Sequence, residues 1–145
     1  MDLVPESLLN QLLTEQYRSL PQYVAACWPW THRGDEEASA ALEKIIKNQQ
    51  EHCRRIAELI LRRGGIVEPG PYAADYTNHN YLALDFLLEA LIRDRKQAIT
   101  RIEQFRQQCL RDQEALALVD SILRDEQNHL KELQSLSARQ HASAL

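Results

Sequence analysis

The sequence contains little of what would interrupt long helices or cross-link the chain. Only four of its 145 residues are Gly and five are Pro, and they gather at three places. The three cysteines, Cys27, Cys53 and Cys109, are an odd number, lie far apart and form no CxxC motif. These features argue against a disulfide framework. They favour reduced thiols, as in a cytoplasmic protein, and long helices with few breaks.

The sequence also lacks the marks of nucleic-acid-binding, membrane and secreted proteins. Its net charge is −4, and acidic and basic residues are interleaved without a basic tract. No apolar run approaches the ~20 residues that span a bilayer. The first residues lack the basic and apolar regions of a signal peptide. We therefore expect one cytoplasmic domain over residues 1–145, with no nucleic-acid or membrane partner.

Apolar residues recur at helical spacing in four segments, and the breaks between these segments carry helix start and stop signals. Pro21 should kink the first helix, Asp35 is a good N-cap, and Gly64-Gly65 should end the second helix. The tail from Arg139 to Leu145 should fray. The pattern predicts helices over about 5–27, 35–63, 80–109 and 113–138.

The segment between the second and third expected helices is too long for a tight turn. It covers about 15 residues from Ile66 to Asn80 and contains Pro and Gly, whereas adjacent helices are usually joined by about two to eight residues. An extended segment of this length can run along a bundle and join two parallel helices. We therefore predict an all-α, up-down-down-up four-helix bundle with a long crossover between helices 2 and 3.

Each expected helix carries polar residues in the middle of its apolar stripe. Burying such groups without partners costs several kcal/mol, of order 2–7 for a neutral polar group. Mid-helix positions of a bundle meet at one level, and carboxylates and imidazoles there are suited to iron, manganese or zinc. The residues are Glu15, Gln49, His52, Asp94, Glu126 and His129.

Taken singly, these residues have simpler interpretations. A Glu-x-x-His pair such as Glu126 and His129 often lies on a solvated helix face, and His52 alone is more often a hydrogen-bonded core histidine than a ligand. Glu15 can cap the kink at Pro21. Gathered at one predicted level on four stripes, however, they indicate a metal site. A polar layer without metal is the alternative.

The combination resembles the ferritin-like superfamily, particularly its bacterioferritin and rubrerythrin-like branches. That family places a Glu on each of two helices and Glu-x-x-His on the other two. Glu15, His52 and the pair Glu126-x-x-His129 match this pattern, as do the helix end at Gly64-Gly65 and the run from Leu123 to His129. The resemblance implies a di-iron centre with Glu15 and Asp94 as terminal carboxylates, His52 and His129 as terminal imidazoles and Glu126 as a bridge.

Two positions depart from the family pattern. Gln49 stands where the second helix should carry a Glu, and Asp94 is one methylene shorter than the usual Glu. Gln49 would ligate weakly through its carbonyl oxygen or lie next to the ligands. With one carboxylate fewer, the site would hold one metal ion or two bound weakly.

The resemblance implies iron oxidation or peroxide reduction, that is, a non-haem iron oxidoreductase. The alternative is a catalytically silent structural or interaction module with a degenerate site, and a third reading is substrate hydroxylation. Iron is the expected metal, with manganese or zinc as alternatives. We expect no haem, because Met1 is the only methionine. The apolar and aromatic residues in the loops lead us to expect a homodimer.

Overall fold

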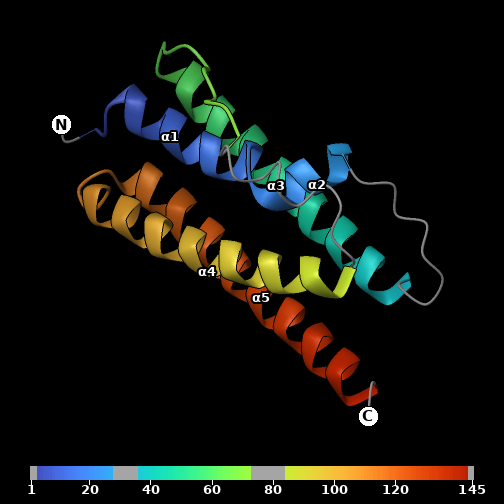
Figure 1. Cartoon of the computed structure of the whole chain (residues 1–145). Helices are drawn as coiled ribbons and strands as arrows, with labels where there is room; N and C mark the ends of the chain where they lie inside the picture. Colours follow the sequence, from blue (N-terminus) through green and yellow to red (C-terminus); the bar gives the residue numbers. More distant parts are fainter. Residues whose placement is uncertain (1–2, 28–35, 73–83, 144–145) are drawn as a thin grey trace.

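The protein is a bundle of α-helices. The computed structural model describes residues 3–27, 36–72 and 84–143, and these contain five helices and no strand. Helices α1 and α2 follow one another along one side of the bundle and pack on α3, while α4 and α5 form a second layer (Figure 1). The all-α prediction is confirmed. The helices are α1 (Glu6–Tyr17), α2 (Leu20–Cys27), α3 (Glu36–Arg62), α4 (Leu84–Gln108) and α5 (Gln113–Ser143).

The first expected helix is divided in two. We expected one helix kinked at Pro21, but α1 ends at Tyr17 and α2 begins at Leu20. Pro21 has no N–H to bond the carbonyl of Tyr17, four residues earlier, and its ring clashes with that carbonyl. As the second residue of α2, by contrast, Pro21 occupies a first turn where no N–H partner is needed.

Helix α3 ends in a Schellman motif. Gly64 has a φ of +78°, and the N–H groups of Gly64 and Gly65 donate to the carbonyls of Leu61 and Ile60 at 3.0 and 2.9 Å. This pattern requires the left-handed conformation that Gly adopts at little cost. Asp35, the expected N-cap of this helix, lies outside the described residues.

Helix α5 is longer than expected. The sequence predicted a helix to about residue 138 and a frayed tail, whereas α5 continues to Ser143. Arg139 lies beyond the expected end and pairs with Glu37 of α3 at 2.8 Å. The expected tail is therefore helical as far as Ser143, and this ion pair ties its beginning to α3.

Asp112 joins three parts of the chain at one end of the bundle. Its carboxylate accepts hydrogen bonds from the N–H of Ala115 in the first turn of α5 and from the N–H of Val4, at 3.2 and 3.0 Å. Both terminal nitrogens of Arg63, just after α3, donate to it at 2.7 and 2.9 Å. The start of α5, the N-terminal segment and the end of α3 therefore meet at one buried carboxylate.

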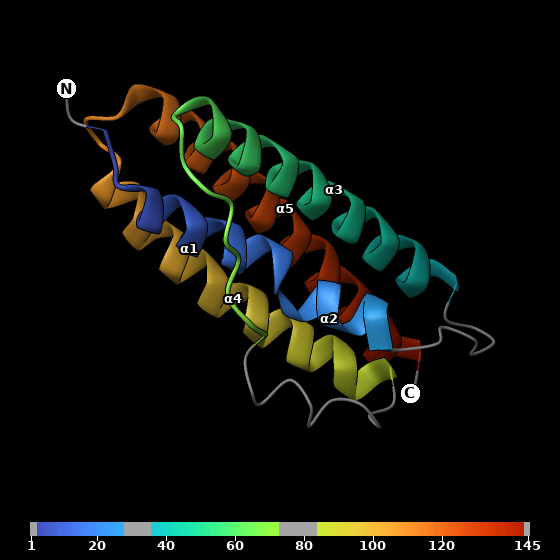
Figure 2. The ribbon, with the colours of Figure 1, turned by 90° about the horizontal axis from the view of Figure 1, so that it is seen from above.

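The segment that leaves α3 runs along α1. Asn10 bonds the backbone of Ile66 and Glu68, Thr14 accepts from the N–H of Gly70, and Arg18 donates to the carbonyl of Gly70. Both sets of residue numbers rise together, so the segment follows α1 from its N-terminal end toward α2, as Figure 2 shows.

The core consists of two apolar clusters with polar residues between them. On α3, on α4 and on α5, residues of the first cluster lie toward one end of the helix and residues of the second cluster toward the other, with polar residues between them. Along the α1–α2 pair, α1 belongs to the first cluster and α2 to the second. The first cluster includes Leu12, Ile56, Ile102 and Ile122, and the second includes Leu20, Ile45, Leu91 and Leu133.

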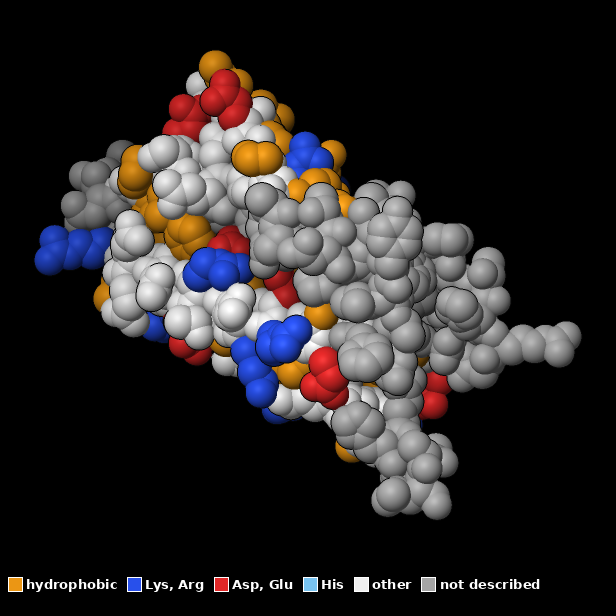
Figure 3. Space-filling model, viewed as in Figure 1, with side chains coloured by type: hydrophobic (Ala, Val, Ile, Leu, Met, Phe, Trp, Pro, Cys, Tyr) orange, Lys and Arg blue, Asp and Glu red, His pale blue; other side chains and the backbone are white. Residues whose placement is uncertain are grey.

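On the face shown in Figure 3, the acidic and basic side chains of the described residues are interspersed. In the part of the chain that the structure describes, no helix is both long enough and apolar enough to cross a membrane.

Candidate functional site

Nine polar side chains form a layer across the middle of the bundle, between the two apolar clusters. We call this set the polar layer. Its members come from the α1–α2 side of the bundle and from α3, α4 and α5. Every predicted site residue except Glu15 belongs to it. Asp125 is half-buried and the other eight side chains are buried. The members are Gln16, Ser19, Gln49, His52, Asp94, Arg95, Asp125, Glu126 and His129.

Arg95 is the central cation of the polar layer. Its side chain is 0% exposed, and its Nη1 donates to Glu126 Oε2 at 2.6 Å. Its Nε and Nη2 both donate to Asp94 Oδ2, at 3.1 and 2.5 Å. Burial alone would lower the pKa of Arg95, but the adjacent carboxylates of Asp94 and Glu126 raise it above its usual value. The guanidinium is therefore permanently charged and bridges the two acids.

Glu126 is ionised although it is fully buried. Besides Arg95, it has two donors to Oε1: Gln49 Nε2 at 3.1 Å and His129 Nδ1 at 3.0 Å. Burial would raise the pKa of Glu126, but the positive charge of Arg95 and the hydrogen bond from His129 lower it below its usual value. Both carboxylate oxygens therefore have protein donors.

Gln49 acts as a hydrogen-bond donor and acceptor at the position where the family pattern has an acid. Its Nε2 donates to Glu126, while its Oε1 accepts from Ser19 Oγ at 2.9 Å and from Gln22 Nε2 at 3.1 Å. A carboxylate at position 49 would face Glu126 without a donor between them. The amide therefore suits this layer.

His52 lies at the side of the layer nearest α1. Its Nδ1 is 2.6 Å from Gln16 Oε1, and its Nε2 is 2.8 Å from Asp125 Oδ2. Asn48 also donates to Asp125, at 3.3 Å. Burial lowers the pKa of His52, and the hydrogen bond to Asp125 opposes this effect. Both ring nitrogens are thus next to protein oxygens.

Glu15, which the sequence placed among the inward-facing site residues, does not contact the polar layer. Glu15 is half-buried and pairs with Arg101 of α4, whose Nη2 donates to Oε1 at 2.9 Å. The residue of α1 that points into the polar layer is Gln16. The buried face of α1 is centred between the Leu8–Leu12 and Leu9–Leu13 rows, and four residues after Leu12 that face reaches position 16.

Comparison with known protein families gives a match over most of the chain. A family model described as a ferritin-like domain matches residues 6–140 of the 145-residue chain. The chain belongs to the ferritin-like family. No curated protein and no solved structure gives a significant match. The resemblance inferred from Glu15, His52 and the Glu126-x-x-His129 motif is therefore confirmed at the level of the family.

Ferritin-like proteins generally bind iron. Among the residues that the structure describes, no three His, Cys, Asp or Glu side chains are grouped so that they could hold a metal ion. Asp94 and Glu126 instead share the guanidinium of Arg95, and His52 and His129 both bond neighbouring side chains. The layer does not fit a ferritin-like di-iron centre.

Four members of the polar layer were not predicted from the sequence: Gln16, Ser19, Arg95 and Asp125. Arg95 follows Leu91 by four residues and precedes Ala98 by three, which is the spacing of a buried position. On α1, the sequence pattern predicted Glu15 as the inward residue instead of Gln16. On α5, it predicted Glu126 but not its neighbour Asp125. For Arg95 the signal was present, because Asp94 and Arg95 flank the Leu91–Ala98 line on opposite sides.

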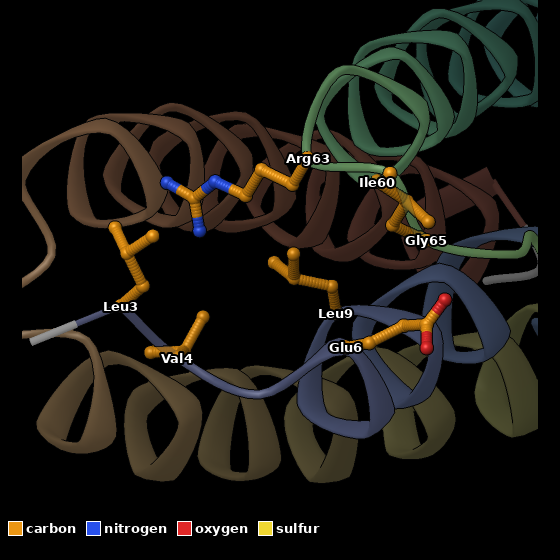
Figure 4. A pocket seen from close by; sticks show the side chains of 8 residues that line it. Leu3, Val4, Glu6, Leu9, Ile60, Arg63 and Gly65 are labelled. Atoms are coloured by element: carbon orange, nitrogen blue, oxygen red, sulfur yellow. The ribbon is translucent and has the colours of Figure 1, made fainter.

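A cavity of about 250 Å³ lies at the end of the bundle that contains Arg63 (Figure 4). Its lining residues Leu9 and Ile60 are about two helical turns from Gln16 and His52 of the polar layer. Leu3, Val4, Leu9 and Ile60 supply apolar walls, and Arg63 also lines it. Arg63 already pairs with Asp112 through both terminal nitrogens. Glu6 lines the cavity as well and accepts a hydrogen bond from the N–H of Ile66. Both charged groups of the cavity therefore have partners within the chain, and the polar layer is the candidate functional site.

Proposed function

We propose that this ferritin-like protein works without a redox-active metal centre, as a catalytically silent structural or interaction module. The observation that carries this proposal is the buried guanidinium of Arg95, which pairs with both Asp94 and Glu126. In a di-iron protein these carboxylates would neutralise metal ions. Here they neutralise a side chain.

Electrostatics support this proposal. Two unit charges of the same sign at about 4 Å repel by about 4 kcal/mol at an effective dielectric constant of about 20. A divalent ion held by the same carboxylates would face roughly twice that repulsion from Arg95, in addition to the loss of existing hydrogen bonds. Iron binding would therefore require Arg95 to leave a site in which it is 0% exposed.

The test is an anaerobic Fe²⁺ titration followed by exposure to air. We expect no stoichiometric binding and no near-ultraviolet band of an oxo-bridged ferric pair. Treatment with EDTA should leave the Tm unchanged, and elemental analysis of the purified protein should find less than one metal ion per chain. One or two tightly bound iron ions per chain, oxidised on exposure to air, would show that the protein is a metalloprotein after all.

We also propose the up-down-down-up helix order. Its support comes from which chain ends lie together. Val4 and Arg63 both bond Asp112, so the start of α1, the end of α3 and the α4–α5 connection share one end of the bundle. The segment after α3 returns along α1. Leu87 and Leu88, near the start of α4, belong to the same apolar cluster as Leu20 of α2.

The homodimer expected from the sequence stays a proposal. Large apolar side chains are exposed at the end of the bundle that contains Asp112: Leu3, Leu61, Ile66 and Leu110. Such a surface suits contact with another protein chain. Light scattering coupled to size-exclusion chromatography tests the proposal. Leu61→Glu should shift a dimer toward monomer. Glu58→Gln, at another exposed position of the same helix, should leave the dimer unchanged.

A further inference from the structure

We propose that the cavity beside Arg63 is a binding site for a small, uncharged, largely apolar molecule. The cavity lies outside the polar layer, so the inference goes beyond the proposed function and does not depend on it. Its lining residues come from the N-terminal segment, from α1 and from the end of α3. Figure 4 shows these three parts of the chain around one space.

The first argument is the size and the wall of this space. It measures about 250 Å³, and three of its lining residues, Val4, Leu9 and Ile60, belong to the first apolar cluster. An apolar cavity of about 150 Å³ is large enough to bind benzene. The larger volume here has room for one aromatic ring with a two-carbon side chain, a molecule of about nine or ten non-hydrogen atoms.

The second argument is that the walls are held in place by the protein itself. Arg63 donates to Asp112 at 2.7 and 2.9 Å, and the N–H of Val4 donates to the same carboxylate at 3.0 Å. On the α1 side, the carboxylate of Glu6 accepts a hydrogen bond from the N–H of Ile66. These contacts fix the N-terminal segment, α1 and the end of α3 relative to one another. A pre-formed pocket loses little conformational freedom when a ligand enters it.

The third argument concerns charge. Glu6 and Arg63 both line the cavity, so an anion inside it would meet the carboxylate and a cation would meet the guanidinium. The charge of Arg63 is already balanced by Asp112, which leaves little attraction for an anionic ligand. A charged molecule would therefore leave water without gaining a full partner, and this costs free energy. An uncharged molecule avoids that cost.

The fourth argument is the way in. Leu3 is 53% exposed, whereas the other apolar side chains of the lining, Val4, Leu9 and Ile60, are at most 8% exposed. A ligand can thus enter from the end of the bundle past Leu3 and contact walls that are shielded from water. Removing apolar surface from water at such walls is the main source of affinity for an apolar ligand.

The experiment uses the full chain and three probes of similar shape: 2-phenylethanol, which is uncharged, phenylacetate, an anion, and 2-phenylethylammonium, a cation. Titration calorimetry measures affinity, and NMR of Leu, Val and Ile methyl groups locates the site. We expect one molecule of 2-phenylethanol per chain with a Kd of about 0.1–1 mM. Both charged probes should bind about tenfold more weakly or worse. The methyl shifts should be largest at Leu3, Val4, Leu9 and Ile60.

Variants that fill the cavity test its location. Leu9→Phe adds volume from α1, and Val4→Phe adds it from the N-terminal segment, so each should abolish the binding of 2-phenylethanol. Either variant that keeps the natural circular dichroism spectrum is sufficient. Leu61→Phe is the matched control, because Leu61 is next to Ile60 but 62% exposed and outside the lining. It should bind 2-phenylethanol as the natural protein does.

Glu6→Gln tests the argument from charge without changing the shape of the cavity. The amide oxygen of the new side chain can still accept from the N–H of Ile66, but the negative charge is gone. The affinity for phenylacetate should rise by about threefold or more, and the affinity for 2-phenylethanol should stay the same. An unchanged affinity for phenylacetate would contradict the assigned role of Glu6.

The remaining outcomes decide the inference as a whole. It is overturned if 2-phenylethanol shows no saturable binding, if the filled variants bind it as well as the natural protein does, or if the charged probes bind equally tightly. Leu61→Glu separates this site from a contact between chains. Because all the lining residues belong to one chain, 2-phenylethanol should bind this variant normally, and loss of binding would place the ligand between two chains instead. None of these results alters the proposed function, whose own test is iron binding.

Discussion

Gln49→Glu is the substitution that tests the polar layer most directly. The amide Nε2 of Gln49 donates to Glu126 Oε1 at 3.1 Å inside a site where both residues are 0% exposed. The substitution removes this donor and places a second acid against the first. In a di-iron protein the same change would supply a missing ligand and strengthen metal binding. Here it should destabilise the fold.

The magnitude follows from the cheaper of two responses. If the introduced carboxyl group stayed ionised, its repulsion with Glu126 at this distance would cost about 5 kcal/mol at an effective dielectric constant of about 20. If it took up a proton, it could donate to Glu126 as the amide does. Protonating at pH 7 a group whose ordinary pKa is about 4.3 costs about 3.5 kcal/mol. We therefore expect the folded protein to protonate it.

The sign of the pH dependence follows from this. The pKa of the introduced group is raised in the folded state, so its destabilising effect is absent below about pH 4 and grows by about 1.4 kcal/mol per pH unit above that. The loss of unfolding free energy should be about 1 kcal/mol at pH 5 and about 3.5 kcal/mol at pH 7.

Urea unfolding followed by circular dichroism at pH 5 and pH 7 measures this loss. Gln50→Glu is the matched control, because it adds the same charge at the next residue, which is exposed, and should change stability by less than about 0.5 kcal/mol at either pH. Equal effects of the two substitutions at pH 7, or a loss at position 49 that does not vary with pH, would refute the assigned contact between Gln49 and Glu126.

Three further predictions concern other parts of the molecule. The hydrogen bonds from Arg63 hold the pKa of Asp112 at about 2, so Asp112 should contribute about 2 kcal/mol above pH 4 and lose it as the pH falls through 2; the penalty of Asp112→Asn in urea should shrink over that range, unlike that of Asp120→Asn at an exposed pair. Gly64→Ala should lower the unfolding free energy by about 1 kcal/mol because Gly64 has a positive φ, and Gly64→Asn should lower it by less; thermal melting measures both. Glu126→Ala should cost about 3–5 kcal/mol and Glu15→Ala no more than about 1 kcal/mol; equal costs would mean that Glu15 is a core residue after all.

The stripes on three of the helices were predictable from the sequence alone. Leu42, Ile45, Ile56 and Leu59 are all buried on α3. Buried residues at the same spacing are Leu87, Leu91 and Ile102 on α4 and Val119, Ile122 and Leu133 on α5. These helices are long and uninterrupted, so the helical period places each residue reliably over many turns. Polar residues inside such a stripe are buried whatever their role, which is why the layer itself was foreseen.

The error on α1 has a different cause. That helix has 12 residues, and its stripe contains two adjacent leucine rows, so positions 15 and 16 continue it almost equally well. The expected helix also ran on through Ser19 to Cys27, and this made Glu15 look central. Once the helix ends at Tyr17, the direction of the remaining turns depends on packing against α3, which a periodic pattern does not contain.

Arg95 shows why the composition of the layer was harder to predict than its position. Sequence patterns treat a charged residue beside another charged residue as part of a solvated face, and in most helices that is correct. Whether the cation of a buried site is a metal ion or a side chain depends on which residues meet across helices. The distance between Arg95 and Glu126, 31 positions apart in the chain, is set by tertiary packing alone.

The core cation of this protein is part of its own chain, and this affects how newly made protein matures. A bundle whose central positive charge is iron acquires that charge only when an iron ion binds. Here the charge is synthesised with the polypeptide, once per molecule, and neither scarcity of a nutrient nor a change of oxidation state can remove it. Newly made chains should therefore mature equally well in iron-starved and iron-replete cells.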